Sequence, residues 1–114
     1  MGEPADELLF TYGTLQYAEV QLDTFGRLIA GEPDVLPGYI IDYVEIEDQR
    51  VVDLSGASVH PVLRETGSPL DKVVGRVLHL TADEVDAADE YEVSLYRRVR
   101  VTLGSGRTAW VYVG

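Results

Sequence analysis

An apolar segment near the N-terminus, Leu8–Leu15, places the strongest constraint on the fold. It reads Leu-Leu-Phe-Thr-Tyr-Gly-Thr-Leu and breaks at Gly13-Thr14, which is typical of a buried strand that ends in a turn. Because Gly13 lacks a Cβ atom, a ligand can approach its backbone closely. We expect Thr14 to cap a following helix, leaving the next amide groups free to bind a carboxylate or a developing oxyanion. An ordinary strand-to-helix turn is the alternative.

Two helices are expected. The first spans Leu15–Ile29, where Leu22, Phe25 and Ile29 are spaced to share one face. The second begins with a capping box at Thr81–Glu84 and extends to Tyr91 or Glu92.

The rest of the chain has the alternating pattern of strands. Short connections between them favour antiparallel pairing, so we expect one domain, residues 1–114, with a strongly twisted or barrel-like sheet and helices outside it. Besides the N-terminal strand, strands are predicted at Asp34–Glu47 (bent or bulged at Pro37-Gly38), Val51–Leu54, His60–Arg64, Val73–Leu80, Leu95–Leu103 and Arg107–Val113, with a turn at Ser55–Ser58.

Charge and composition exclude several classes of protein. Nine Lys and Arg residues against 20 Asp and Glu residues give a formal net charge of −11, which disfavours nucleic acid and anionic membranes as partners. The absence of cysteine excludes disulfides and thiolate chemistry. No apolar run is long enough to span a membrane, and the start of the chain is acidic, unlike a signal peptide. We therefore expect a cytoplasmic protein.

The second predicted helix carries a carboxylate on its apolar stripe. Val85, Ala88 and Glu92 fall within about 60° of one another around a helix, and Asp89 is close to the same stripe. A partly buried glutamate beside another carboxylate should have a raised pKa, as a general acid or base near neutrality requires. Alternatively, the helix frays and Glu92 is solvated, or Glu92 pairs with Arg97 or Arg98.

Metal and hydrolase sites find little support. The two histidines, His60 and His79, fall in predicted strands without an obvious carboxylate partner, so we expect no metal site. A serine hydrolase is disfavoured because the sequence has no Gly-x-Ser-x-Gly motif.

Several short motifs, in this order, resemble the gamma-glutamylcyclotransferase-like superfamily, which includes the gamma-glutamylamine cyclotransferases and the avirulence-induced plant proteins. The resemblance spans nearly the whole chain. The motifs are Tyr12–Leu15, Pro37–Tyr39, His60–Val62, Val74–Leu78, Asp89–Glu92 and Tyr96–Arg98.

This resemblance implies an α+β fold, a small mixed and mostly antiparallel β-barrel flanked by helices. It also implies that Tyr12, Gly13, Thr14 and Leu15 hold the substrate and that Glu92 is the catalytic glutamate. Asp89 would have a structural, hydrogen-bonding role. The sequence departs from the family pattern at Val93, where a glycine is common, and this leaves the width of the pocket and the identity of the substrate open.

The implied reaction converts a gamma-glutamyl amine or peptide to 5-oxoproline and releases the amine, with Glu92 as general acid and base. It needs no metal or cofactor, because the substrate supplies its own nucleophile. The expected partner is a small gamma-glutamyl molecule; the oligomeric state is not predicted. The alternative is a non-catalytic domain of the same fold that binds a small carboxylate or another protein.

Overall fold

The computed structural model describes residues 4–45, 59–92 and 96–113. The predicted strand Val51–Leu54 and turn Ser55–Ser58 lie outside these residues and stay predictions. The elements, in chain order, are β1 (Glu7–Thr11), the 3-10 helix η1 (Thr14–Gln16), α1 (Ala18–Phe25), β2 (Gly31–Pro37), β3 (Tyr39–Glu45), β4 (Val59–Glu65), β5 (Lys72–Leu80), α3 (Ala82–Glu92), β6 (Arg97–Thr102) and β7 (Thr108–Val113).

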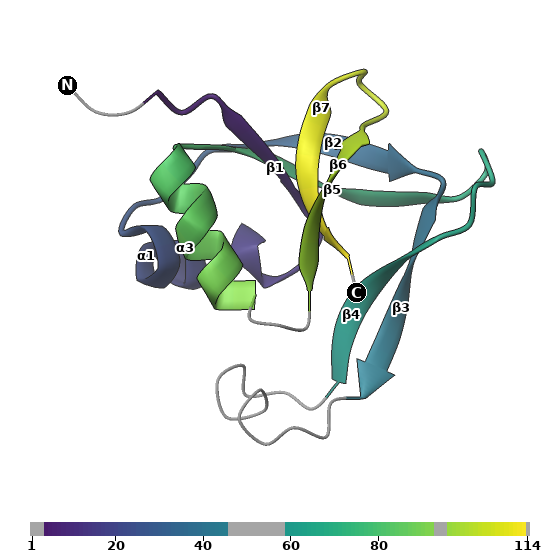
Figure 1. Cartoon of the computed structure of the whole chain (residues 1–114), viewed down its shortest axis with the longest axis horizontal. Helices are drawn as coiled ribbons and strands as arrows, with labels where there is room; N and C mark the ends of the chain where they lie inside the picture. The colour runs from purple at the N-terminus through teal and green to yellow at the C-terminus, as the bar shows by residue number, and fades with distance from the viewer. Residues whose placement is uncertain (1–3, 46–58, 93–95, 114) are drawn as a thin grey trace.

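A five-stranded sheet lies at the centre of the described structure (Figure 1). Its order is β2-β5-β1-β7-β6, and all neighbours are antiparallel except β1 and β7, which are parallel. β3 and β4 form a separate antiparallel pair, while α1 and α3 pack together on the other side of the molecule (Figure 1). The predicted α+β fold with a mixed, mostly antiparallel sheet and flanking helices is confirmed. Among the described strands, the sheet is open and has a two-stranded extension, so its barrel is not closed.

The first helix is shorter than the sequence predicts. Instead of covering Leu15–Ile29, α1 begins at Ala18 and ends at Phe25. Tyr17, before it, is still extended, and Gly26, after it, has the left-handed φ of 72° that glycine adopts easily and that stops a helix. Neither this helix nor any other described one is long and apolar enough to cross a membrane.

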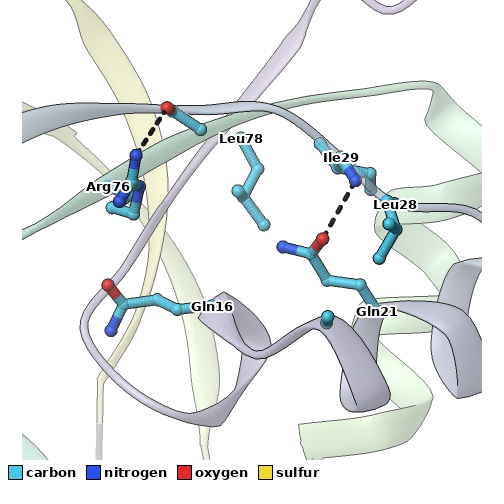
Figure 2. Close-up of a pocket in the computed structure, with 8 residues that line it drawn as sticks. Gln16, Gln21, Leu28, Ile29, Arg76 and Leu78 are labelled. Carbon is cyan, nitrogen blue, oxygen red and sulfur yellow. Dashed lines mark hydrogen bonds between the residues drawn. The ribbon is translucent and has the colours of Figure 1, made fainter.

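The buried face of α1 also differs from the prediction. Leu22 is 51% exposed, and the buried residue of α1 is Gln21. The Gln21 side chain donates a hydrogen bond to the Leu15 carbonyl at 3.0 Å and accepts one from the Ile29 amide at 2.9 Å; Figure 2 shows the second bond. Both ends of this buried amide are therefore satisfied. The predicted apolar stripe of Leu22, Phe25 and Ile29 is wrong at Leu22.

The predicted strand Asp34–Glu47 is divided in two. β2 ends at Pro37, β3 begins at Tyr39, and Gly38 between them has a left-handed φ of 81°. Because β2 pairs with β5 and β3 pairs with β4, the chain passes from one sheet to the other at the predicted bend. The four strands that follow start and end within one or two residues of their predicted bounds.

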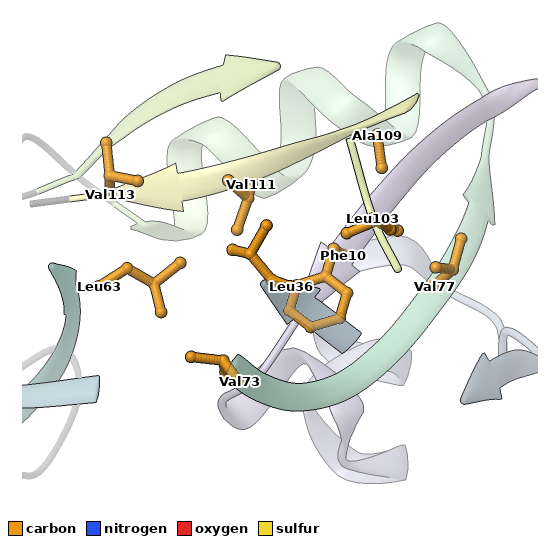
Figure 3. Close-up of a cluster of buried hydrophobic side chains, with 9 residues drawn as sticks. All are labelled: Phe10, Leu36, Leu63, Val73, Val77, Leu103, Ala109, Val111 and Val113. Carbon is orange, nitrogen blue, oxygen red and sulfur yellow. The ribbon is translucent and has the colours of Figure 1, made fainter. Parts of the chain in front are cut away.

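β1 separates two clusters of buried apolar side chains. Successive residues of a strand point to opposite faces, so Leu9 packs with the residues beneath the helices and Phe10 with the other cluster, which Figure 3 shows. Leu9 and Phe10 are 0% and 1% exposed. Burial on both faces explains why this strand reads as a continuous apolar run. β1 is therefore shared by both clusters, and the single domain over residues 1–114 stays a prediction.

The start of α3 is fixed as the sequence predicts. The Thr81 amide donates to the Glu84 carboxylate at 2.9 Å, and the Glu84 amide donates to the Thr81 hydroxyl at 3.2 Å. Arg27, just after α1, also donates to Glu84 at 2.7 Å, which ties the two helices together. The capping box is confirmed, and the helix runs to Glu92.

Candidate active site

The loop that follows β1, Tyr12–Leu15, exposes backbone groups. Gly13 has a φ of −126°, and a Cβ atom there would meet nothing within 4 Å among the described residues. The fold itself therefore does not require a glycine here, and there is open space beside its backbone. The amide groups of Thr14 and Leu15 make no hydrogen bond to a described residue, so they are available to a ligand.

Thr14 does not cap α1. It is the first residue of η1, which has no side-chain cap, and α1 begins four residues later. Its hydroxyl instead lies 2.6 Å from the hydroxyl of Tyr91. The predicted cap is wrong, and the hydroxyl pair links the loop to the last turn of α3, next to Glu92.

Two glutamines hold the carbonyl side of the loop. The backbone amide and the side-chain amide of Gln16 both donate to the Gly13 carbonyl, each at 3.2 Å. Gln21 donates to the Leu15 carbonyl, and the Leu15 side chain is 2% exposed in the cluster beneath the helices. The loop is therefore anchored by its carbonyls and by one apolar side chain, while the amides of Thr14 and Leu15 stay open.

Glu92 is the last residue of α3. Val85 and Ala88 are buried, as their spacing predicts, and Glu92 follows on the same stripe and is partly buried. Burial raises the pKa of the Glu92 carboxyl from 4.5 to about 7. No described residue donates a hydrogen bond to this carboxylate, so nothing in this part of the chain offsets its loss of solvation.

Asp89, one turn earlier, is fully engaged. Its carboxylate accepts hydrogen bonds from Arg98 Nε at 2.9 Å, from Arg98 Nη2 at 3.1 Å and from the Tyr112 hydroxyl at 2.7 Å. Arg98, which the sequence left as a possible partner of Glu92, thus pairs with Asp89. The pKa of Glu92 is raised by burial, as predicted, but a neighbouring carboxylate, the other expected cause, does not contribute to it.

Three tyrosines lie near Glu92. Burial is the main cause that raises the pKa of each of them, and the negative charge of Glu92 adds to it. The pKa of Tyr96 rises to about 12. Tyr12 donates to the Tyr112 carbonyl at 3.1 Å, so the loop after β1, the end of α3 and β7 meet at this point. Together with Glu92, the three tyrosines come from four separate segments of the chain. Of the three, only Tyr12 and Tyr96 lie in motifs that were predicted from the sequence.

The described part of the chain contains no recognisable metal centre. Within the described ranges there is no group of three or more His, Asp or Glu side chains that could hold an ion. His79 pairs with Glu32, and both side chains are largely exposed. The side chain of His60 lies outside the described residues. The expectation that no metal or cofactor is needed stays a prediction.

A small pocket of about 260 Å³ lies between α1, β2 and β5 (Figure 2). Glu92 and the three tyrosines do not line it. The pocket is lined by Gln16, Ala18, Gln21, Leu28, Ile29, Gly31, Arg76 and Leu78. It is therefore a separate feature, although Gln16 and Gln21 connect it to the loop after β1.

A known protein family matches this chain over most of its length. The model of the family described as "Gamma-glutamyl cyclotransferase, AIG2-like" matches residues 9–114. No curated protein matches the sequence at a significant level.

Solved structures with this fold have low sequence identity to the chain. A solution structure of a protein from Arabidopsis thaliana is 22% identical with a TM-score of 0.69, covering 99% of this chain and 65% of that one. An uncharacterized protein from Homo sapiens is 18% identical with a TM-score of 0.72, covering 94% and 65%. A protein named gamma-glutamyl cyclotransferase is 18% identical with a TM-score of 0.68, also covering 94% and 65%. These likenesses establish the fold, and the chain spans somewhat less than two thirds of these structures.

Proposed function

The chain belongs to the gamma-glutamyl cyclotransferase, AIG2-like family, and from this we propose that it converts gamma-glutamyl amines or peptides to 5-oxoproline without a cofactor. The observation that carries the proposal is the partly buried carboxyl of Glu92, whose pKa burial raises to about 7. A general base works best when its pKa is near the working pH. The negative charge of Glu92 also raises the pKa of Tyr12. Tyr12 is the first residue of the loop in which the Thr14 and Leu15 amides are open.

The substrate brings its own nucleophile. Its α-amine attacks the carbonyl carbon at the other end of the same glutamyl group, a new C–N bond closes a five-membered ring, and the bond to the leaving amine breaks. Because the attack is intramolecular, the protein has to fold the substrate, move protons from the attacking to the leaving nitrogen and stabilise one charge. This is consistent with a site built from one carboxylate and backbone amides.

In the proposed mechanism Glu92 moves the proton. It takes a proton from the α-ammonium group, which frees the attacking lone pair, and gives that proton to the leaving nitrogen as its bond to carbon breaks. The ring nitrogen then loses a second proton to the carboxylate, which passes it to the released amine, so that the products are the neutral lactam and an ammonium ion. The amides of Thr14 and Leu15 would hold the oxyanion that develops on the attacked carbonyl. Gly13 would leave room for the substrate beside the backbone, since a Cβ atom there would extend into open space.

The charge of the protein bears on the choice of substrate. A formal net charge of −11 repels a dianionic substrate, so we propose gamma-glutamyl amines with neutral or cationic leaving groups as the preferred class. The preference should be strongest at low ionic strength, where charge is screened least.

A non-catalytic domain that binds a small carboxylate is the second candidate. It is favoured by Val93, which stands directly after Glu92 where the family commonly has glycine. Val93 lies outside the described residues.

The test is to incubate the protein with a panel of gamma-glutamyl amines and peptides and to measure 5-oxoproline, with Glu92→Gln as the matched control. Formation of 5-oxoproline by wild type but not by the variant supports the enzyme. If neither protein forms 5-oxoproline from any member of the panel, but both bind a member of the panel, the carboxylate-binding candidate replaces the enzyme.

A further inference from the structure

Arg76 on β5 is held by backbone and not by a carboxylate. Its Nη2 donates to the Gly31 carbonyl at 3.1 Å, and its side chain packs directly over Gly31. It makes no ion pair with a described residue, although the chain has 20 acidic residues and 9 Lys and Arg. Four other arginines do pair with carboxylates: Arg27, Arg64, Arg98 and Arg107. Arg76 is thus held in place with part of its guanidinium free of such partners.

This guanidinium lines the pocket of about 260 Å³ between α1, β2 and β5 (Figure 2). Apolar walls are supplied by Leu28 and Ile29, which follow α1, and by Leu78 on β5. Leu28 is 59% exposed, so its side chain is accessible to a ligand at the rim of the pocket. The pocket therefore combines one cationic group with an apolar surface.

We propose that this pocket binds a small organic anion with a single carboxylate and a short apolar body. The planar guanidinium matches a carboxylate in geometry and charge, and the apolar body would cover Leu28 and Leu78. One arginine in an acidic protein is a poor match for a multiply charged anion such as phosphate, whose extra charge would meet the net negative field. The site shares no lining residue with the Glu92 region, and the proposal does not depend on the proposed reaction.

The probe for this site is 4-methylpentanoate, with 4-methylpentanamide as its neutral isostere. Binding to the full chain is followed by NMR at the backbone amides of Gly31 and Leu78, which line the pocket. A ligand this small should bind with roughly millimolar affinity, and the amide should bind at least about tenfold more weakly. Equal binding of the two, or no saturation of either, overturns the proposal.

Variants separate the pocket from other anion sites. Arg76→Gln should weaken carboxylate binding by about tenfold or more, whereas Arg64→Gln, an exposed arginine on β4, should leave it unchanged. Leu28→Ser, at a position already half exposed, should weaken binding by about fivefold through the lost apolar contact. Gly13→Val should not affect this site even if it abolishes binding at the Tyr12–Leu15 loop. Wild-type affinity in Arg76→Gln would show that the carboxylate binds elsewhere.

Discussion

The buried carboxyl of Asp34 on β2 and the partly buried carboxyl of Glu92 at the end of α3 have opposite surroundings. Burial by itself raises the pKa of Asp34, but hydrogen bonds from the Ser105 hydroxyl, the Val35 amide and Arg107 outweigh it and hold the pKa below its usual value. Glu92 is also withdrawn from water, yet no described residue donates a hydrogen bond to it, and its pKa rises to about 7.

The difference shows what each carboxyl can do. Asp34 joins β2 to the turn between β6 and β7, and its charge is fully used in that connection. No described residue uses the lone pairs of Glu92, and with a pKa of about 7 it can exchange a proton near neutral pH. Burial with partners makes a structural carboxylate, and burial without them makes a candidate base. Each prediction below tests one side of this contrast.

The largest expected effect is the loss of turnover in Glu92→Gln. The amide keeps the volume and one acceptor but cannot take a proton, so kcat should fall by about 10² to 10⁴ while substrate binding survives. Release of 5-oxoproline under saturating substrate measures kcat, and isothermal titration with 5-oxoproline measures binding. Near-full activity of Glu92→Gln, or a greater loss of turnover in Asp89→Asn, would show that another group is the base.

The pKa of Glu92 should also make stability depend on pH. In the folded state its pKa is about 7 and in the unfolded state 4.5, so the folded state binds more protons between these values. The contribution of this group to the unfolding free energy is complete below pH 4.5 and falls by about 3 kcal/mol as the pH rises through 7. Urea unfolding at several pH values, compared with Glu92→Gln, isolates this slope.

The rate should change in the opposite sense over the same range, because only the ionised form of Glu92 accepts a proton. If the unfolding free energies of wild type and Glu92→Gln change in parallel from pH 5 to 8, the raised pKa of Glu92 is contradicted.

Gly13→Val tests the open backbone beside the base. A side chain there extends into space that the fold leaves empty, so the melting temperature should change little, whereas binding of 5-oxoproline should weaken by about a hundredfold or more. Calorimetric titration and thermal unfolding of the same samples measure both effects. Unchanged affinity would show that the ligand does not approach Gly13.

Asp34→Asn tests the structural carboxylate. Removing the charge weakens its bonds to Ser105 and Arg107, and we expect a loss of about 2 kcal/mol in unfolding free energy with unchanged kcat. Asp42→Asn is the matched control. Both side chains of the ion pair between Asp42 and Arg64 are exposed, so this pair should contribute less than about 0.5 kcal/mol to the unfolding free energy. Equal losses of unfolding free energy in Asp34→Asn and Asp42→Asn would show that burial of the carboxylate does not strengthen its contribution to stability.

Local patterns in the sequence predicted the Glu92 side of this contrast, but not the bonds of Asp34 to the distant residues Ser105 and Arg107. The capping box at Thr81–Glu84 and the spacing that puts Glu92 on the stripe of Val85 and Ala88 both depend on one helix, and the structure has them as predicted. The break at Gly13-Thr14 likewise located the end of β1 to within two residues.

What the sequence could not supply depends on groups far apart in the chain. Gln21 lies in the interior because it bridges a carbonyl before α1 and an amide after it, which no hydrophobic pattern can indicate. Arg98 could have paired with Asp89 or with Glu92, and only the packing of β6 and β7 beside the helix assigns it to Asp89. The chain also passes from one sheet to the other at Gly38 because different partner strands lie beside β2 and β3, which the local sequence does not specify.

The smallest expected effect concerns the hydroxyl pair between Thr14 and Tyr91, which joins the loop to the turn of α3 that carries Glu92. At 2.6 Å it is a short hydrogen bond, but Tyr91 is 39% exposed, so its contribution to stability should be below about 1 kcal/mol. If the pair sets the position of the base relative to the loop, Tyr91→Phe and Thr14→Val should each lower kcat by about threefold to tenfold with little change in binding, and the double variant should lose no more than either single one. The test is to measure kcat for wild type, the two single variants and the double variant. Additive losses would mean that the two hydroxyls act separately, and Glu92 would then be positioned by the helix alone.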